Sequence, residues 1–192
     1  MSNVAATSKA VDAMQPDWAL ATALLGGTRA MRAASTTYLP RFPNEDPEAY
    51  RSRLASSVLF PAYKRTVETL TGKPFSKPIT VGDDVPPQIV EWLPDVDMEG
   101  RNLDAFAADV MEYALAFGLT GILVDYPIKP EGVKTQADEK AIKLRPYFVH
   151  VKPDQIIGWQ AARVNGEWTI QQLRLMEMVS EPDGEFGSND VK

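Results

Sequence analysis

Apolar residues follow a helical period most clearly between residues 102 and 118. They recur there at spacings of three and four, which is the period of one helix face, and the set is Leu103, Phe106, Ala107, Val110, Met111, Ala114 and Phe117. Asn102 is a suitable N-cap for this helix, and Gly118 can adopt the left-handed conformation that ends one. The apolar, β-branched run at residues 122–124 then predicts a buried strand. We expect this helix and strand to pack together at the centre of the fold.

Shorter helices are predicted in residues 16–75, separated by prolines and glycines. Pro16 opens a short helix, and two prolines make residues 38–43 an extended linker. Asp46 followed by Pro47 is the pattern of a helix N-terminus. Because a further proline falls inside the next apolar pattern, we expect a break near residues 56–57 and a second helix after it.

Strand patterns dominate the last third of the chain. After a long polar loop over residues 127–143, β-branched and aromatic runs predict strands at residues 145–151, 155–164 and 168–176. Asn165-Gly166 lies between the last two runs and is a strong hairpin signal, so these two strands should be antiparallel.

We therefore expect an α+β fold. N-terminal helices and one long central helix would pack on a small, mostly antiparallel sheet in the C-terminal half, as a single domain over residues 16–180. Residues 1–15 are small and polar and predict a flexible N-terminal arm. Residues 181–192 are polar, with two glycines and one proline, and predict a flexible C-terminal tail.

Composition excludes several kinds of site. The chain of 192 residues has no cysteine, which excludes disulfides, thiolate metal sites and cysteine nucleophiles. Its single histidine, His150, excludes a histidine-rich metal site within one chain. The apolar run at residues 18–25 is far shorter than the roughly 20 residues of a membrane helix, and no targeting segment is evident. We expect a soluble chain made in a cytoplasm, with no cofactor and no metal ion.

Charge is divided unevenly along the chain. Residues 1–80 carry 10 Lys/Arg and 6 Asp/Glu, a balance of +4, whereas residues 81–192 carry 10 and 20, a balance of −10. The acidic half argues against ordinary tight binding of nucleic acid, which needs many cations to neutralise phosphates. The basic half is suited to an acidic partner surface or to the acidic half of another copy, and solvated surface charge is the alternative.

Carboxylates and the histidine are the candidate catalytic residues. Asp104, Asp109 and Glu112 lie on one predicted helix, where they indicate a solvated face, because acid–base catalysis needs carboxylates that converge across a cleft. Asp125 at a strand end and His150 on a later strand would form a pair only if those strands are neighbours. His150 is otherwise an interface residue or a hydrogen-bonded core residue. No nucleophile elbow, glycine-rich phosphate loop or paired metal spacing is present.

Arginines are frequent in the first third of the chain and alternate with aromatic residues. They are candidates for a subunit interface, and the set is Arg29, Arg32, Arg41, Arg51 and Arg53. Acidic residues are mixed among them, so salt bridges within or between subunits are favoured over a nucleic-acid patch.

Three segments together resemble the portal proteins of tailed bacteriophages, the head-to-tail connectors. The first is residues 28–32 followed by YLPRFPNEDPEAYRSRL (38–54), and the second is VLFPAYKRTVETLTGKPF (58–75), similar to a portal helix that ends in Leu-x-Gly-Lys-Pro-Phe. The third is ALAFGLTGILVD (114–125) with VKPDQIIGW (151–159), similar to a portal helix, a "Phe-Gly" stop and two strands. The order and spacing of the three segments carry the resemblance.

The resemblance implies a structural virion protein without catalytic residues. Portal proteins form a homo-oligomeric ring, typically a dodecamer, at one capsid vertex, where capsid protein, terminase and tail or adaptor proteins dock. Double-stranded DNA passes through the ring without sequence-specific binding. Portal proteins are usually more than twice as long as this chain, so the resemblance implies an N-terminal, wing-like portion of a longer protein. A phage adaptor or scaffold-interaction module, and a small hydrolase or nuclease that uses Asp125 and His150, are the alternatives.

Overall fold

The structure, a computed structural model, describes residues 5–177, 179–183 and 187–191. The helices are α1 (Lys9–Leu25), α2 (Gly27–Ala33), α3 (Pro47–Ser56), α4 (Ala62–Gly72), α5 (Pro87–Val90), α6 (Leu103–Phe117) and α7 (Gln136–Ala141), with 3-10 turns at Ser35–Thr37, Pro74–Ser76 and Pro153–Gln155. The strands are β1 (Gly121–Asp125), β2 (Tyr147–Val151), β3 (Ile156–Val164), β4 (Glu167–Leu175), β5 (Val179–Asp183) and β6 (Gly187–Val191). The fold is α+β, as the sequence predicts.

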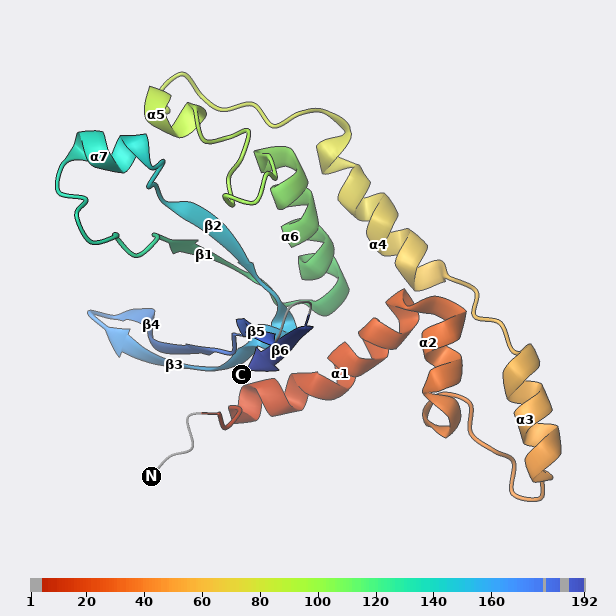
Figure 1. The fold of residues 1–192 in the computed structure, drawn as a ribbon. Helices are drawn as coiled ribbons and strands as arrows, with labels where there is room; N and C mark the ends of the chain where they lie inside the picture. The colour runs from red at the N-terminus through yellow and green to blue at the C-terminus, as the bar shows by residue number, and fades with distance from the viewer. Residues whose placement is uncertain (1–4, 178, 184–186, 192) are drawn as a thin grey trace.

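The strands form antiparallel pairs. In the described residues β1 pairs with β2, β3 with β4, and β5 with β6, and each pair is a separate two-stranded sheet. Asn165 and Gly166 both have positive φ, 53° and 90°, in the turn between β3 and β4, which confirms the predicted hairpin. The expected single small sheet is therefore divided into separate pairs, of which β1–β2 lies beside α6 (Figure 1).

Helix α6 begins and ends where the sequence predicts. The Asn102 side chain accepts a hydrogen bond from the Ala105 N–H at 2.9 Å, and Gly118 ends the helix with φ of 72°. Phe106 on this helix is 1% exposed and packs beside Phe148 of β2, with ring centroids 5.7 Å apart. The centre of the core thus lies between α6 and β2.

The N-terminal helices are attached to the C-terminal end of α6. The Trp18 indole of α1 donates a hydrogen bond to the Phe117 carbonyl at 3.0 Å, and the Tyr63 hydroxyl of α4 donates to the Ala116 carbonyl. Both carbonyls belong to the last turn of α6, where the C=O groups have no hydrogen-bond partner within the helix. From this point α2 and α3 extend away from the body, so the molecule is elongated (Figure 1).

The predicted start of the first helix is wrong. Helix α1 begins at Lys9, not at Pro16, and contains Pro16 in its interior. Ser8 caps the helix through the Val11 N–H, and the Ser8 N–H donates to the Ile157 carbonyl of β3 at 2.8 Å. Because Val11 is buried, residues 9–15 belong to the packed fold and not to a flexible arm. Residues 1–4 of the expected arm lie outside the described residues.

Two further expectations need correction. The strand predicted at residues 122–124 exists as part of β1, but its side chains are between 40% and 61% exposed instead of buried. Residues 181–192 were expected to be a flexible tail, whereas β5 (Val179–Asp183) and β6 (Gly187–Val191) pair as antiparallel strands. The long polar loop also contains α7, which Thr135 caps.

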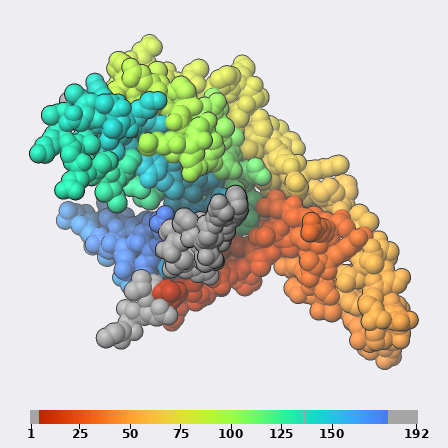
Figure 2. Space-filling view, viewed as in Figure 1, coloured from red at the N-terminus to blue at the C-terminus, as the bar shows by residue number. Residues whose placement is uncertain are grey.

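The chain exposes much more surface than a compact monomer of its mass. Its accessible surface is 14143 Å² for 21.2 kDa, whereas folded monomers of this size expose about 9,000 Å². The space-filling view shows the cause, since α2, α3 and part of α4 protrude from the body (Figure 2). Large apolar side chains remain uncovered on this surface, among them Phe42, Val58, Phe60, Ile128, Trp168 and Ile170.

Candidate functional site

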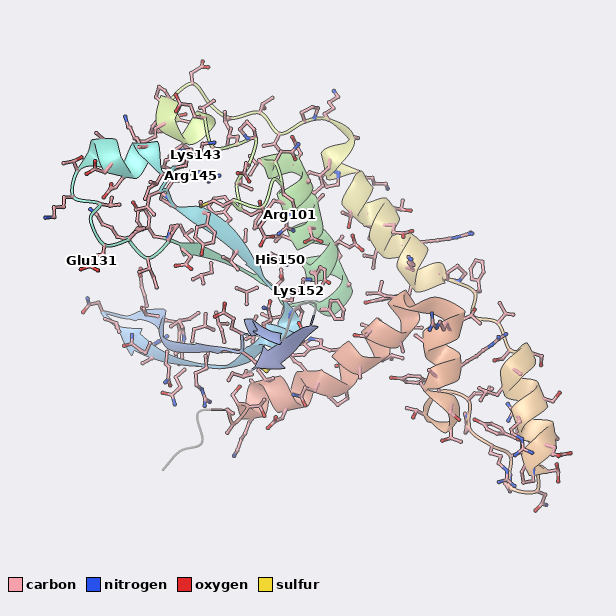
Figure 3. The ribbon with its side chains drawn as sticks, in the orientation of Figure 1. Arg101, Glu131, Lys143, Arg145, His150 and Lys152 are labelled. Atoms are coloured by element: carbon pink, nitrogen blue, oxygen red, sulfur yellow. The ribbon has the colours of Figure 1, made fainter. Side chains whose placement is uncertain are left out.

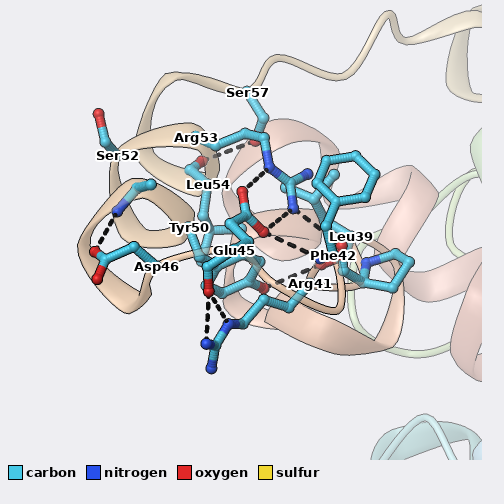
Figure 4. Close-up of polar contacts among 12 residues, drawn as sticks. Leu39, Arg41, Phe42, Glu45, Asp46, Tyr50, Ser52, Arg53, Leu54 and Ser57 are labelled. Carbon is cyan, nitrogen blue, oxygen red and sulfur yellow. Dashed lines mark hydrogen bonds and ion pairs between the residues drawn. The ribbon is translucent and has the colours of Figure 1, made fainter.

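Two of the five arginines that were expected at a subunit interface make contacts within the arm of residues 38–56 instead. Arg53 binds the Glu45 carboxylate through Nε at 2.7 Å and Nη2 at 2.8 Å, and its guanidinium lies over the rings of Phe42 and Tyr50 (Figure 4). The hydrogen bond from Arg53 lowers the pKa of Glu45 below its ordinary value. Arg41 donates two hydrogen bonds to the Glu45 carbonyl, at 3.0 and 2.6 Å. Arg53 of α3 therefore holds the linker at residues 38–46 against the helix, and Arg41 closes a turn within that linker.

The other three arginines differ in their surroundings. Arg32 donates to the Ser57 carbonyl through Nε at 2.8 Å and Nη2 at 2.6 Å, which joins α2 to the segment after α3. Arg51 reaches only Glu48, at 3.5 Å on an exposed face. Arg29 is exposed. Arg29 and Arg51 therefore remain the members of the set whose charge is most available to a partner.

Asp125 and His150 do not form the pair that the catalytic hypothesis requires. In the β1–β2 register, Asp125 faces Tyr147 and His150 faces Ile122, so the two candidates lie at opposite ends of the strand pair. Asp125 instead accepts a hydrogen bond from the Tyr147 hydroxyl at 2.9 Å, which raises the pKa of Tyr147.

His150 is a buried residue with a partner on each ring nitrogen. Its Nδ1 lies 3.0 Å from Asp109 Oδ2 on α6, and its Nε2 lies 2.7 Å from the Thr120 hydroxyl before β1. The Tyr113 ring packs edge-on against the imidazole at 5.0 Å between centroids. Figure 3 shows His150 where β2 lies beside α6, and its side chain reaches Asp109 on that helix. Asp109 was expected on a solvated helix face and instead joins the helix to the strand.

The order carboxylate, imidazole, hydroxyl has the sequence of groups found in a catalytic triad, but the hydroxyl is not free to act as a nucleophile. The Thr120 hydroxyl also donates to the Val151 carbonyl at 3.1 Å, next to His150 in β2. Because a carboxylate only accepts, His150 Nδ1 donates to Asp109. The single hydroxyl proton of Thr120 is donated either to the Val151 carbonyl, while the oxygen accepts from Nε2, or to Nε2 in place of that carbonyl. The three groups thus bond to one another and join α6, the start of β1 and β2.

Arg101 extends this network to a buried carboxylate. It donates through Nη1 to Asp109 at 3.2 Å and through Nε to Asp97, which is 4% exposed. Burial by itself would raise the pKa of Asp97, but hydrogen bonds from the Glu99 N–H, the Arg101 side chain and the Arg101 N–H outweigh it and lower that pKa. The hydrogen bond to Asp97, with the charges of the neighbouring carboxylates, in turn raises the pKa of Arg101 despite its partial burial.

An open cavity of about 270 Å³ lies beside this network, and Lys152 and Gln155 are also in its wall. Three carboxylates line it, those of Asp97, Glu99 and Asp109, and all three lie within 4 Å of the Arg101 guanidinium. Within the described part of the chain, no group of three or more His, Cys, Asp or Glu side chains is placed to hold a metal ion. The cavity is thus lined by charged and polar groups that are largely paired with one another.

A second cavity is almost entirely apolar. It measures about 220 Å³ and lies between α5 and the β1–β2 pair, with Ile89, Trp92, Val124 and Phe148 among its walls. Arg145 lies at its edge, where its ion pair with Asp95 at 3.1 Å neutralises the charge. An apolar hollow next to the exposed β1 strand is suited to an apolar side chain rather than to a charged substrate.

Sequence reasoning missed both the Asp109–His150 contact and the apolar cavity. The cavity joins residues 89–96 to β1 and β2, and no local pattern reports which distant segments meet. One signal in the sequence was available for the Asp109–His150 contact. Asp109 follows Phe106 by three residues, about one helical turn, so the two side chains lie near each other on the helix surface. That spacing places Asp109 near the edge of the apolar stripe.

Comparisons with known proteins do not assign the chain to a family. No family model matches the chain, and a search of curated proteins gives no match either. Among the described residues, no helix has both the length and the apolar character that crossing a bilayer requires.

Proposed function

We propose that the chain is a structural subunit of the portal ring of a tailed bacteriophage, at the head–tail vertex of the virion. The observation that carries this proposal is the accessible surface of 14143 Å², about 5,000 Å² above that of a compact monomer. A standard protein–protein interface buries about 1,600 Å² in total. The uncovered surface is therefore large enough for contacts with two neighbours, as each subunit of a ring requires.

The segments that resemble portal proteins support the same role. They cover the extended arm from α2 to α3, the whole of α4, and the centre of the body, where α6 leads into β1. The Leu-x-Gly-Lys-Pro-Phe step is the end of α4 and the turn at Pro74–Ser76. The resemblance thus includes the segments that protrude and not only the core that any fold of this class needs.

Charge supports a conduit rather than a nucleic-acid binder. The formal net charge is −6, and the acidic residues lie mostly in the second half. Like charge prevents the counterion release that gives proteins their affinity for DNA, so duplex DNA can pass an acidic ring without adhering to it. The basic first half and the acidic second half are complementary, which favours a head-to-tail contact between copies.

The alternatives receive less support. A phage adaptor or scaffold-interaction module would share the exposed surfaces but stay monomeric when alone. A hydrolase or nuclease that uses Asp125 and His150 has no geometric support, because the strand register separates the two side chains.

Native mass tests the proposal. We expect light scattering after size exclusion to give a discrete oligomer many times the 21.2 kDa of one chain, with a mass that decreases at high salt because salt screens the charged contacts. A mass of one chain at every concentration and salt would contradict the proposal. An oligomer whose mass is unchanged at high salt would keep the ring and contradict the charge-driven contact.

A further inference from the structure

The segment between α3 and α4 presents two apolar side chains to solvent. Val58 is 79% exposed and Phe60 is 72% exposed, although large apolar side chains are usually covered. Their neighbours Ser57, Leu59 and Pro61 are turned partly inward. The alternation is that of an extended chain with one face on the protein and one face free.

This segment is held in place by hydrogen bonds. Arg32 donates two of them to the Ser57 carbonyl, and the Leu59 N–H donates to the Thr28 hydroxyl at 3.1 Å. The Arg65 guanidinium lies 5.8 Å from the centre of the Phe60 ring. Because the backbone is fixed, Val58 and Phe60 would lose little conformational freedom on binding, which lowers the cost of docking them.

A receptor for such side chains exists elsewhere on the same molecule. The apolar cavity between α5 and the β1–β2 pair has about 220 Å³ of space, and Trp92, Val124 and Phe148 supply aromatic and aliphatic walls. Val124 is 61% exposed, so the cavity opens onto uncovered apolar surface. The cavity is of a size to accept one aromatic ring.

The chain segments that carry the two surfaces differ in charge. Residues 57–75 carry three Lys/Arg and one Glu, whereas residues 81–100, which form one side of the cavity, carry six Asp/Glu and no Lys/Arg. On the other side, Arg145 is paired with Asp95, and Lys140 and Lys143 lie near Glu91. Figure 1 shows the α3–α4 segment and α5 far apart on the molecule, so Phe60 of one chain does not reach the cavity of the same chain. A second copy brings the two surfaces together.

We propose that Phe60, with Val58 beside it, inserts into the cavity lined by Trp92, Val124 and Phe148 of a second copy of this chain. The contact joins two different surfaces, so it is heterologous and repeats from copy to copy until a ring closes. This inference rests on the proposed ring function and names the two surfaces that make the ring.

The first test compares two exposed aromatic residues. Phe60→Asp removes the phenyl group and would place a charge in the apolar cavity, so the native mass should fall from that of the oligomer to the 21.2 kDa of one chain. Trp168→Asp is the matched control, because Trp168 on β4 is also 72% exposed but lies outside both surfaces, and it should keep the oligomer. Circular dichroism of both variants establishes that they fold.

The outcomes separate this contact from the ring itself. An oligomer that persists in Phe60→Asp overturns the contact while the ring proposal stands. An unsubstituted chain that is monomeric under all conditions overturns both.

Cysteine cross-linking gives a second and independent readout, since the natural chain has no cysteine. A chain carrying both Val58→Cys and Ile89→Cys should form a ladder of multimers with a short thiol-reactive cross-linker, because each copy joins two neighbours. Val58→Cys and Ile89→Cys made singly should form only one cross-linked dimer when mixed and none alone. Absence of the ladder overturns the proposal, and so does cross-linking of Val58→Cys to itself. This readout also decides the case in which Phe60→Asp and Trp168→Asp both dissociate the oligomer.

Discussion

Asp97 is a buried carboxylate that the loop before α6 keeps charged. It accepts hydrogen bonds from the Glu99 N–H at 2.9 Å and the Arg101 N–H at 3.1 Å, and it pairs with the Arg101 side chain. These contacts favour the ionised form and lower the pKa of Asp97 in the folded protein. The stability that they contribute is therefore linked to pH.

Replacing this carboxylate should reduce stability in a pH-dependent way. We expect Asp97→Asn to lower the free energy of unfolding by about 1–3 kcal/mol at pH 7, because charged hydrogen bonds are lost in a buried site. The pKa of Asp97 is lower in the folded protein than in the unfolded chain, where it is near 3.9. The carboxylate therefore contributes its full stabilisation when the pH is above about 3.9, and this contribution is lost as the pH falls through the pKa of the folded protein. Urea unfolding at fixed protein concentration from pH 7 to pH 3 should therefore show the difference shrinking below about pH 4.

Glu99→Gln is the matched control for this prediction. Glu99 is exposed and lies 3.8 Å from Arg101, so its loss should leave the stability nearly unchanged across the same pH range. A difference between Asp97→Asn and the natural chain that stays constant down to pH 3 would show that the Asp97 charge is not the cause.

At single residues, local signals were predictable and distant partners were not. Asn102 and Gly118 were identified from the sequence because a cap acts on backbone groups within one turn. His150 was correctly expected as either an interface or a hydrogen-bonded core residue, and it is the latter. Its partner Asp109 was not predicted, because that contact depends on how α6 lies against β2.

Among the elements, the end of α6 depends on glycine in a way that can be measured. Gly118 has φ of 72°, where an added Cβ meets no neighbouring atom but does strain the backbone. We expect Gly118→Ala to lower the free energy of unfolding by about 1–2 kcal/mol. Gly72 at the end of α4 has equally open surroundings without positive φ, so Gly72→Ala should be neutral or stabilise by up to about 1 kcal/mol. Equal effects in chemical denaturation would contradict the strain at Gly118.

The elements themselves were largely predictable, but their burial and their limits were not. The α3 N-terminus, α6 and the β3–β4 hairpin follow from caps, period and turn residues, which are local. The apolar run in β1 predicted a strand correctly and burial wrongly, because burial depends on a covering layer that this chain alone does not supply. Helix α1 starts early because Ser8 binds β3, a contact far away in sequence.

For the whole molecule, the elongated shape and the uncovered apolar surface have one physical explanation. An isolated chain that exposes about 5,000 Å² beyond a compact monomer would gain free energy by covering part of it. The arm from α2 to α4 offers apolar side chains with basic neighbours, and the region of α5 and β1 offers an apolar cavity with acidic neighbours. Repeated contact between these two regions generates a closed ring or an open fibre, depending on the angle between copies.

Negative-stain electron microscopy of the purified chain tests the ring most directly. The account predicts closed rings of uniform size with a central channel, typically of twelve copies as the resemblance to portal proteins implies. Phe60→Asp should give only small, elongated particles in the same buffer, and Trp168→Asp should keep the rings. Isolated particles, or open filaments without closed rings, from the natural chain at every concentration tried would contradict the account.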